Sequence, residues 1–186
     1  MKTQYYAASS LDGFIATESD SLEWLFQLGD VPDSSYPEFI ANVGAIAMGS
    51  ATYRWILDNA EQVASHTGSA WPYTCPTWVF TSRQHPTIPH AKINFVRGNV
   101  RAAFPAMRAA AGERNIWVVG GGDLAGQFAD EGLLDEIIVQ IGSATLGRGK
   151  PLFPRALLAP ALRLTRVTRL GPEMVELRYD VQRPSR

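Results

Sequence analysis

Uninterrupted apolar runs, each followed by a glycine or a polar turn, recur along the chain and alternate with amphipathic segments. Short runs rich in β-branched and aromatic residues are typical of strands that are buried on both faces of a sheet. The pattern predicts strands at residues 3–9, with an extension at 14–16, and at 45–48, 77–81, 93–96, 116–119, 136–141, 164–170 and 174–181.

The amphipathic segments between these runs predict helices at 21–28, 37–43, 51–59, 100–111 and 124–131. Ser21 is a typical N-cap, and Pro37 stands at an early helical position where its missing N–H costs nothing. Gly112 and Gly132 follow the last two helices as typical terminators. Residues 61–76 are rich in Ser, Thr and Gly and contain two prolines, so we expect a long surface loop there.

Strands and helices alternate through the first three quarters of the chain, and the last quarter contains strands alone. Such alternation places crossover helices over a mostly parallel sheet. The last two strands are joined through Gly171 and Pro172 without a helix, which predicts an antiparallel C-terminal hairpin. The length of 186 residues is that of one domain. We therefore expect a single α/β domain over residues 1–186, with a mostly parallel central sheet flanked by helices.

Charge and cysteine content exclude several kinds of partner. Seventeen Lys and Arg against eighteen Asp and Glu give a net charge of −1, so no global field attracts nucleic acid or anionic lipid. Cys75 is the only cysteine, and the three histidines lack helical metal-ligand spacing, so neither a disulfide nor a metal site is expected. No signal-peptide pattern and no apolar run of about 18 residues is present. We expect a cytoplasmic protein without a membrane-spanning segment.

The clearest local signal is the stretch 116–125, in which an apolar strand runs into three glycines and then a helix. Without Cβ atoms, Gly120, Gly121 and Gly122 let a ligand approach the backbone, and the helix N-terminus offers unpaired N–H groups to a phosphate. The alternative is a tight strand-to-helix turn that binds nothing.

Two other strand ends carry polar groups of the same kind. Gly49 and Ser50 follow the strand at 45–48, where Ser50 is either a ligand contact or simply an N-cap. Ser82 and Arg83 follow the strand at 77–81, and a guanidinium can grip a phosphate with two hydrogen bonds, although such an arginine can equally be a solvated surface residue. Because ligands of open α/β sheets bind at the carboxyl ends of the strands, we expect these segments to converge on one elongated, phosphate-bearing ligand.

Two further segments allow two interpretations each. Asp12 and Gly13 lie between strand-like runs, a typical hairpin signal, but the carboxylate could instead lie beside a ligand pocket. The glycine-rich basic segment 146–153 is either a mobile connection or part of a lid over an anionic ligand.

Taken together, these segments resemble the RibD C-terminal-domain family, the reductase domain of riboflavin biosynthesis, within the dihydrofolate-reductase-like superfamily. The resemblance rests on five motifs in order along almost the whole chain: 10–16 (SLDGFIA), 48–53 (MGSATY), 81–83 (TSR), 119–125 (VGGGDLA), and 135–136 (DE) with 146–153 (LGRGKPLF). It implies a dihydrofolate-reductase-like fold that binds NADPH and transfers hydride to a pterin- or (ribosylamino)pyrimidine-like small molecule, as a 5-amino-6-(5-phosphoribosylamino)uracil reductase does.

The resemblance also assigns roles to individual residues. Ala8 and Ile15 would flank the nicotinamide, and Asp12 would face the reaction centre as proton donor or substrate contact. The glycine turn would pack on the pyrophosphate and nicotinamide side through Gly120, Gly121, Gly122, Asp123 and Leu124. The cofactor phosphates would contact Gly49, Ser50 and Thr52, and the 2′-phosphate would contact Ser82 and Arg83, with Thr81 in the same cofactor-binding segment. Because a 2′-hydroxyl would leave Arg83 without an anion, NADP is expected rather than NAD. Trp24 would line the substrate side or belong to the core.

Some features depart from the family pattern. Val119 stands where the riboflavin enzymes have Glu, and Ser50 stands where the phosphate segment has Arg, which removes one positive charge. The signature of the companion zinc deaminase is absent, so the chain is not the bifunctional enzyme. Alternatives to a reductase are a non-catalytic NADP(H)-binding module and a relative in fold alone. By analogy we expect a homodimer.

Overall fold

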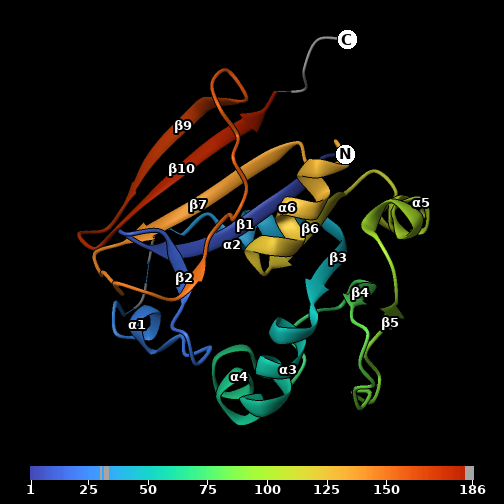
Figure 1. Cartoon of the computed structure of the whole chain (residues 1–186). Coiled ribbons are helices and arrows are strands. Elements are labelled where there is room, and N and C mark those ends of the chain that lie inside the picture. Colours follow the sequence, from blue (N-terminus) through green and yellow to red (C-terminus); the bar gives the residue numbers. More distant parts are fainter. Residues whose placement is uncertain (30, 32–33, 183–186) are drawn as a thin grey trace.

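The computed structural model describes residues 1–29, 31 and 34–182, and within these residues eight strands form one sheet (Figure 1). The strand order is β5-β4-β3-β6-β1-β7-β10-β9. Its members are β1 (Thr3–Ser10), β3 (Val43–Gly49), β4 (Thr77–Phe80), β5 (Ile93–Val96), β6 (Asn115–Gly120), β7 (Glu136–Gly142), β9 (Leu162–Leu170) and β10 (Met174–Val181). The first six strands in that order run parallel, and β10 and β9 close one edge as an antiparallel pair. The predicted fold class is confirmed.

Helices cover both faces of the sheet. They are α1 (Glu23–Phe26), α2 (Tyr36–Ala41), α3 (Ser50–Asp58), α4 (Ala60–Thr67), α5 (Val100–Ala111) and α6 (Gly122–Asp130). None of the helices in the described ranges is long and apolar enough to cross a membrane. Figure 1 shows α5 and α6 on one side of the sheet, and side chains of α2 and α3 belong to the core of the opposite face.

The two faces carry separate apolar cores because strand residues alternate between them. Tyr5 and Tyr6 are adjacent in β1 and both buried, yet Tyr5 belongs to the core under α5 and α6 and Tyr6 to the core under α2 and α3. Trp117 of β6 lies in the second core, where its indole N–H donates to the Tyr6 carbonyl at 3.1 Å. Over β1 and β6, where the sheet is covered on both faces, the strand ends are what remains open to a ligand.

The expected loop at 61–76 is partly wrong, because α4 occupies its first half. The sequence of α4 is polar and provides few apolar positions, among which Val63 packs against the second core. Gly68 ends the helix in the left-handed conformation, with φ of 79°. Short helices gain most of their stability from such packing, which the local pattern does not reveal.

Smaller differences concern element boundaries and one strand pairing. Helix α1 spans fewer residues than the predicted 21–28, and β3 already begins at Val43, which the pattern assigned to a helix. The hairpin interpretation of Asp12–Gly13 is wrong. The short strand β2 (Phe14–Ala16) pairs with β8 (Lys150–Pro151), far along the chain, and not with β1.

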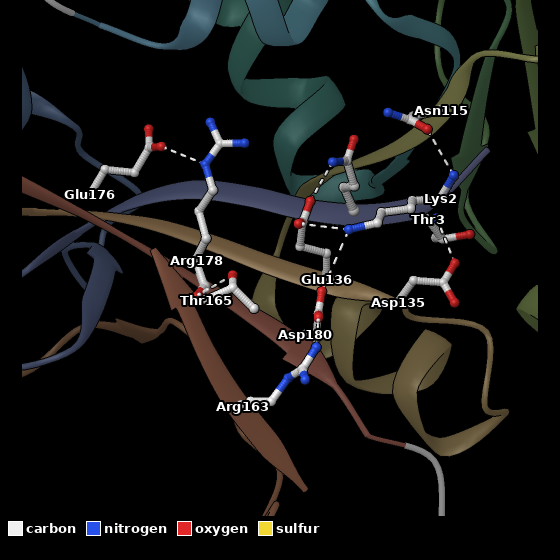
Figure 2. A network of polar contacts seen from close by, with 11 residues as sticks. Lys2, Thr3, Asn115, Asp135, Glu136, Arg163, Thr165, Glu176, Arg178 and Asp180 are labelled. Atoms are coloured by element: carbon white, nitrogen blue, oxygen red, sulfur yellow. Dashed lines mark hydrogen bonds and ion pairs between the residues drawn. The ribbon is translucent and has the colours of Figure 1, made fainter. Parts of the chain in front are cut away.

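Ion pairs lie at the edge of the sheet opposite the glycine turns, where the parallel strands begin and β10 ends (Figure 2). Lys2 lies 3.0 Å from Glu136 at the start of β7 and 3.5 Å from Asp180 in β10. Arg163 of β9 reaches the same Asp180 at 2.9 Å. Charges at this edge are therefore paired within the protein and stabilise the strand order.

Glu176 of β10 carries a buried carboxylate on the face of the sheet that α2 and α3 cover, and 1% of the residue's surface is exposed. Burial acts to raise its pKa, but hydrogen bonds donated by Ser35, Gln140 and Arg178 outweigh this effect, so the pKa lies below its ordinary value. A carboxyl group with a lowered pKa stabilises the folded protein above its ordinary pKa, and that stability is lost as the pH falls through the folded-state pKa.

We expect Glu176→Gln to lower the free energy of unfolding by about 2 kcal/mol at pH 7, because the amide leaves Arg178 without its counter-charge. The deficit should shrink as the pH falls below about 4.5, where wild-type Glu176 itself becomes protonated on unfolding. Urea unfolding at pH 7, 5 and 3.5 measures it, with the exposed Glu113→Gln as control. A deficit that stays constant over this range would contradict the assignment.

Gly44 of β3 provides a second test of the packing. A Cβ at this position would lie 2.5 Å from the carbonyl oxygen of Ala111 and 2.8 Å from its Cα, so the end of α5 would have to shift. Gly44→Ala should therefore lower the unfolding free energy by about 1–3 kcal/mol. Gly49→Ala, in the same strand, meets its nearest atoms at 3.7 Å and should be close to neutral for stability. Equal effects of the two variants would refute the argument.

Candidate functional site

The carboxyl ends of β3 and β6 approach each other through glycine backbone. A Cβ at Gly49 would lie 3.7 Å from the Gly120 oxygen and the Gly121 nitrogen, and a Cβ at Gly120 would lie 3.1 Å from Oγ1 of Thr52. The peptide bond between Gly120 and Gly121 is cis. The structure thus brings two of the predicted segments together into a surface without side chains, with a hydroxyl beside it.

Ile15 reaches this surface from β2. Its Cδ1 atom would lie 3.9 Å from a Cβ at Gly121, so an apolar side chain borders the glycine turn. Ala8 is half-buried near the end of β1, where its register partner is Gln140 of β7. Both predicted nicotinamide neighbours therefore lie at the carboxyl edge of the sheet, although only Ile15 is shown to approach the glycines.

The rest of the glycine motif is packed against protein. A Cβ at Gly122 would lie 2.3 Å from the Leu152 oxygen, and Leu124 is buried in the core. The Asp123 carboxylate accepts hydrogen bonds from Gln127 at 2.9 Å and Arg155 at 3.0 Å, which lower its pKa. Gly122 and Leu124 could thus contact a ligand only through their backbone, while the exposed Asp123 carboxylate is already paired with Arg155.

The end of β4 lies beside the end of β3, because Gly49 and Phe80 are register partners. Thr81 follows β4, and its hydroxyl accepts a hydrogen bond from the Arg83 N–H at 3.0 Å, which shapes the turn. Ser82 and Arg83 are exposed. Within the described residues, neither side chain has a hydrogen-bond or ion-pair partner, so both are available to a ligand.

Sequence reasoning missed His85 in this segment. Its Nε2 lies 2.8 Å from Oγ of Ser50, the residue at which α3 begins. The two positions are 35 residues apart, and no periodicity or motif connects them. The only available signal was that a histidine follows a strand end carrying Ser82 and Arg83.

Asp12 holds a neighbouring segment in place. Its carboxylate accepts hydrogen bonds from Ser10 Oγ at 2.6 Å and from the backbone N–H groups of Leu146 and Gly147 at 3.0 and 2.7 Å. These bonds, that of Ser10 foremost, lower its pKa, so the group is ionised and accepts rather than donates at neutral pH. The predicted role as proton donor or substrate contact stays a prediction, and the contacts favour a positioning role.

The glycine-rich segment that follows is fixed at further points. The Leu152 N–H donates to the Gly13 carbonyl and the Leu152 oxygen accepts from the Tyr5 hydroxyl, both at 2.9 Å. Of the two interpretations of residues 146–153, the mobile connection is therefore disfavoured. The segment packs over β2 and the start of α6, beside the glycine turn.

A cavity of about 390 Å³ lies between the 19–26 segment and α3. Its lining includes Leu22, Phe26, Ala51, Arg54 and Trp55, and the Phe26 and Trp55 rings stack at 6.3 Å. The rest of the lining is polar, and it places the carboxylates of Asp20, Glu23 and Asp58 beside the Arg54 guanidinium.

Trp24 does not line this cavity as far as the described residues show. It is buried against the end of β7, with Cζ3 3.2 Å from a Cβ at Gly142. Its indole N–H has no hydrogen-bond partner among the described residues. This position fits the core alternative of the sequence, and a place for Trp24 on the substrate side stays a prediction.

The donor set fits a phosphorylated dinucleotide such as NADPH. Gly49, Gly120 and Gly121 leave a cradle that side chains would otherwise fill, and Thr52 adds a hydroxyl to it. Arg83 adds a guanidinium at the neighbouring strand end, a group that binds phosphate bidentately.

The fold, with this edge, defines a dihydrofolate-reductase-like α/β protein. Dihydrofolate reductase from Enterococcus faecalis, in complex with NADP(H) and RAB-propyl, matches with a TM-score of 0.64 at 12% identity, over 98% of this chain and 97% of that one. More narrowly, the model of the RibD C-terminal domain matches residues 2–176, so the chain belongs to that family.

Two further proteins match this chain over almost its whole length. The uncharacterized protein YwjB of Bacillus subtilis (strain 168) is 32% identical over 179 residues, which span 96% of this chain and 97% of YwjB. A "Putative riboflavin biosynthesis protein" from Shewanella sp. PV-4 has a crystal structure that matches with a TM-score of 0.79 at 23% identity, over 98% of this chain and 100% of that one.

Removing the Asp12 charge should release the 146–149 segment. In Asp12→Asn the side chain keeps one acceptor oxygen, but its NH2 group cannot accept a hydrogen bond. The oxygen alone cannot replace both carboxylate oxygens as acceptor for the Leu146 and Gly147 N–H groups. We expect tryptic cleavage at the exposed Arg148 to become at least about fivefold faster at pH 7, with overall stability little changed. Cleavage at the same rate as wild type, followed by mass spectrometry, would show that Asp12 does not hold this segment. Asp58→Asn is the matched control.

Proposed function

We propose that this protein is an NADPH-dependent reductase that transfers hydride to a pterin- or pyrimidine-type small molecule. The observation that carries the proposal is the surface without side chains formed by Gly49, Gly120 and Gly121, with Ile15 at its border. Glycines at two adjacent strand ends, among which Gly49 and Gly121 are half-buried, allow the close approach to backbone that a dinucleotide requires.

The polar groups along the edge support NADPH as the cofactor. NADPH supplies the hydride when bound, and the chain's own residues bind it, orient it and exclude water. Thr52 beside Gly120 offers a hydroxyl to the phosphates, and Ile15 offers an apolar border to the nicotinamide ring. Arg83, exposed and without an internal partner in the described part of the chain, suits the 2′-phosphate. The NADP(H) complex of a dihydrofolate reductase with the same fold agrees with this assignment.

The cavity between the 19–26 segment and α3 supports a heteroaromatic substrate. It lies next to the first turn of α3, the turn whose Thr52 faces the glycines. Phe26 and Trp55, whose rings stack on each other, offer an apolar face to a flat ring, and the carboxylates of Asp20, Glu23 and Asp58 can accept hydrogen bonds from its N–H and amino groups. Pterins and aminopyrimidines carry such donors, and the riboflavin-related name of the Shewanella protein favours this class.

Arg83→Gln tests the cofactor assignment without disturbing the fold, since Arg83 is exposed. We expect its affinity for NADPH to fall about tenfold, because one charge-assisted contact with the 2′-phosphate is lost, and its affinity for NADH to stay nearly constant. Calorimetric titration of both dinucleotides measures the two affinities, with Arg108→Gln on α5 as control. If the wild-type protein shows no heat with millimolar NADPH, the proposed function fails.

Turnover is tested by following NADPH oxidation across a panel of pterins and pyrimidines. Oxidation with at least one of them is the expected result. NADPH binding without turnover on any of them would instead indicate a binding module.

A further inference from the structure

The hydrogen bond between Ser50 and His85 lies at the same edge as the proposed cofactor. His85 Nε2 and Ser50 Oγ are 2.8 Å apart, and both residues are partly exposed. The bond joins the start of α3 to the segment that follows Ser82 and Arg83.

The first turn of α3 has two sides. Thr52 faces the glycine turn of β6, since its Oγ1 lies 3.1 Å from a Cβ at Gly120. Ser50 instead faces the segment after β4, through His85. The pairing of β3 with β4 agrees with this placement of Ser50. Gly49 pairs with Phe80, so the residues that follow them, Ser50 and Thr81, lie at neighbouring strand ends. Ser50 therefore belongs with the Ser82–Arg83 end of the site, away from Gly120 and Gly121.

Aromatic packing fixes the His85 ring in this position. The ring meets Tyr53 edge-on, with centroids 5.6 Å apart and planes at 81°, and it stacks on Phe95 at 6.2 Å. Tyr53 is fully buried and its hydroxyl donates to the Pro86 carbonyl at 2.7 Å, which holds the residue after His85. The imidazole is thus oriented before any ligand arrives.

We propose that His85 is a positioning residue for the 2′-phosphate of NADPH, acting through Ser50. With a proton on Nε2, His85 donates to Ser50 Oγ, which leaves the hydroxyl proton of Ser50 to donate to a phosphate oxygen. This inference rests on the proposed function and deepens it, since it assigns the discrimination between NADPH and NADH to Ser50 and His85 as well as to Arg83.

A purely structural role of His85 makes a different prediction. If the imidazole only ties the segment after β4 to α3, its removal weakens NADPH and NADH alike. If it orients Ser50 toward the 2′-phosphate, the loss falls on NADPH. The ratio of the two affinities therefore separates the roles.

The test compares His85→Gln with wild type by calorimetric titration of NADPH, NADH, adenosine 2′,5′-bisphosphate and adenosine 5′-monophosphate. We expect NADPH and the bisphosphate to bind about five- to tenfold more weakly, with NADH and the monophosphate changed less than twofold. His90→Gln, the same substitution at an exposed position of the same segment, should bind all four like wild type.

Rescue makes the test stricter. Ser50→Arg, introduced into His85→Gln, places a guanidinium directly at the phosphate and should restore the preference for NADPH. If His85→Gln fails to fold, as judged by circular dichroism, Ser50→Ala leaves the aromatic packing of His85 intact and should show the same loss of preference.

The outcomes distinguish the two proposals. If wild type binds NADPH but the variants keep its full preference, or lose both dinucleotides equally, the role of His85 is overturned and the proposed function stands. If wild type binds neither dinucleotide, the proposed function fails and the inference fails with it.

Discussion

The close approach of β3 and β6 at their carboxyl ends is the constraint on which the site depends. Gly49 faces the backbone of Gly120 and Gly121 at ordinary contact distance even for an added Cβ, so larger side chains at these positions would fill the space between the two turns. Both strands then pass directly into helices, α3 and α6. The glycines thus determine where backbone is open to a ligand, and the helices determine which polar groups border it.

A second set of contacts holds the border of that surface from the other side. Strand β2 carries Ile15 toward the glycines, and β2 is positioned by its pairing with β8 and by the bonds from Asp12 to the 146–147 backbone. Arg155 adds ion pairs to Asp123 and Asp130 of α6 at 3.0 and 2.8 Å. Residues 146–155 thereby fix both β2 and α6. Asp12 and Arg155, which make these contacts, are engaged in holding the site together.

The sequence allowed most of the sheet to be predicted, because its buried strands are continuous apolar runs such as the one ending at Gly120. It also indicated that the strands ending at Gly49 and Gly120 meet at one edge of the sheet. What it could not give were contacts between distant segments: the pairing of β2 with β8, the capture of Asp123 by Arg155, and the bond of Ser50 to His85. Each depends on tertiary packing and leaves no periodic trace. Helix α4 was missed for a related reason, since packing rather than pattern stabilises it.

Charged residues differ between the two edges of the sheet in whether they pair with one another. At the amino-terminal edge, Lys2, Glu136, Asp180 and Arg163 satisfy one another. At the carboxyl edge, Arg83 has no internal partner within the described residues. A chain with a net charge of −1 has no overall attraction for an anion, so affinity for an anionic ligand has to come from local cations such as Arg83. Because the charges of the opposite edge already pair with one another, the exposed Arg83 is the cation that the proposed contact with the 2′-phosphate would use.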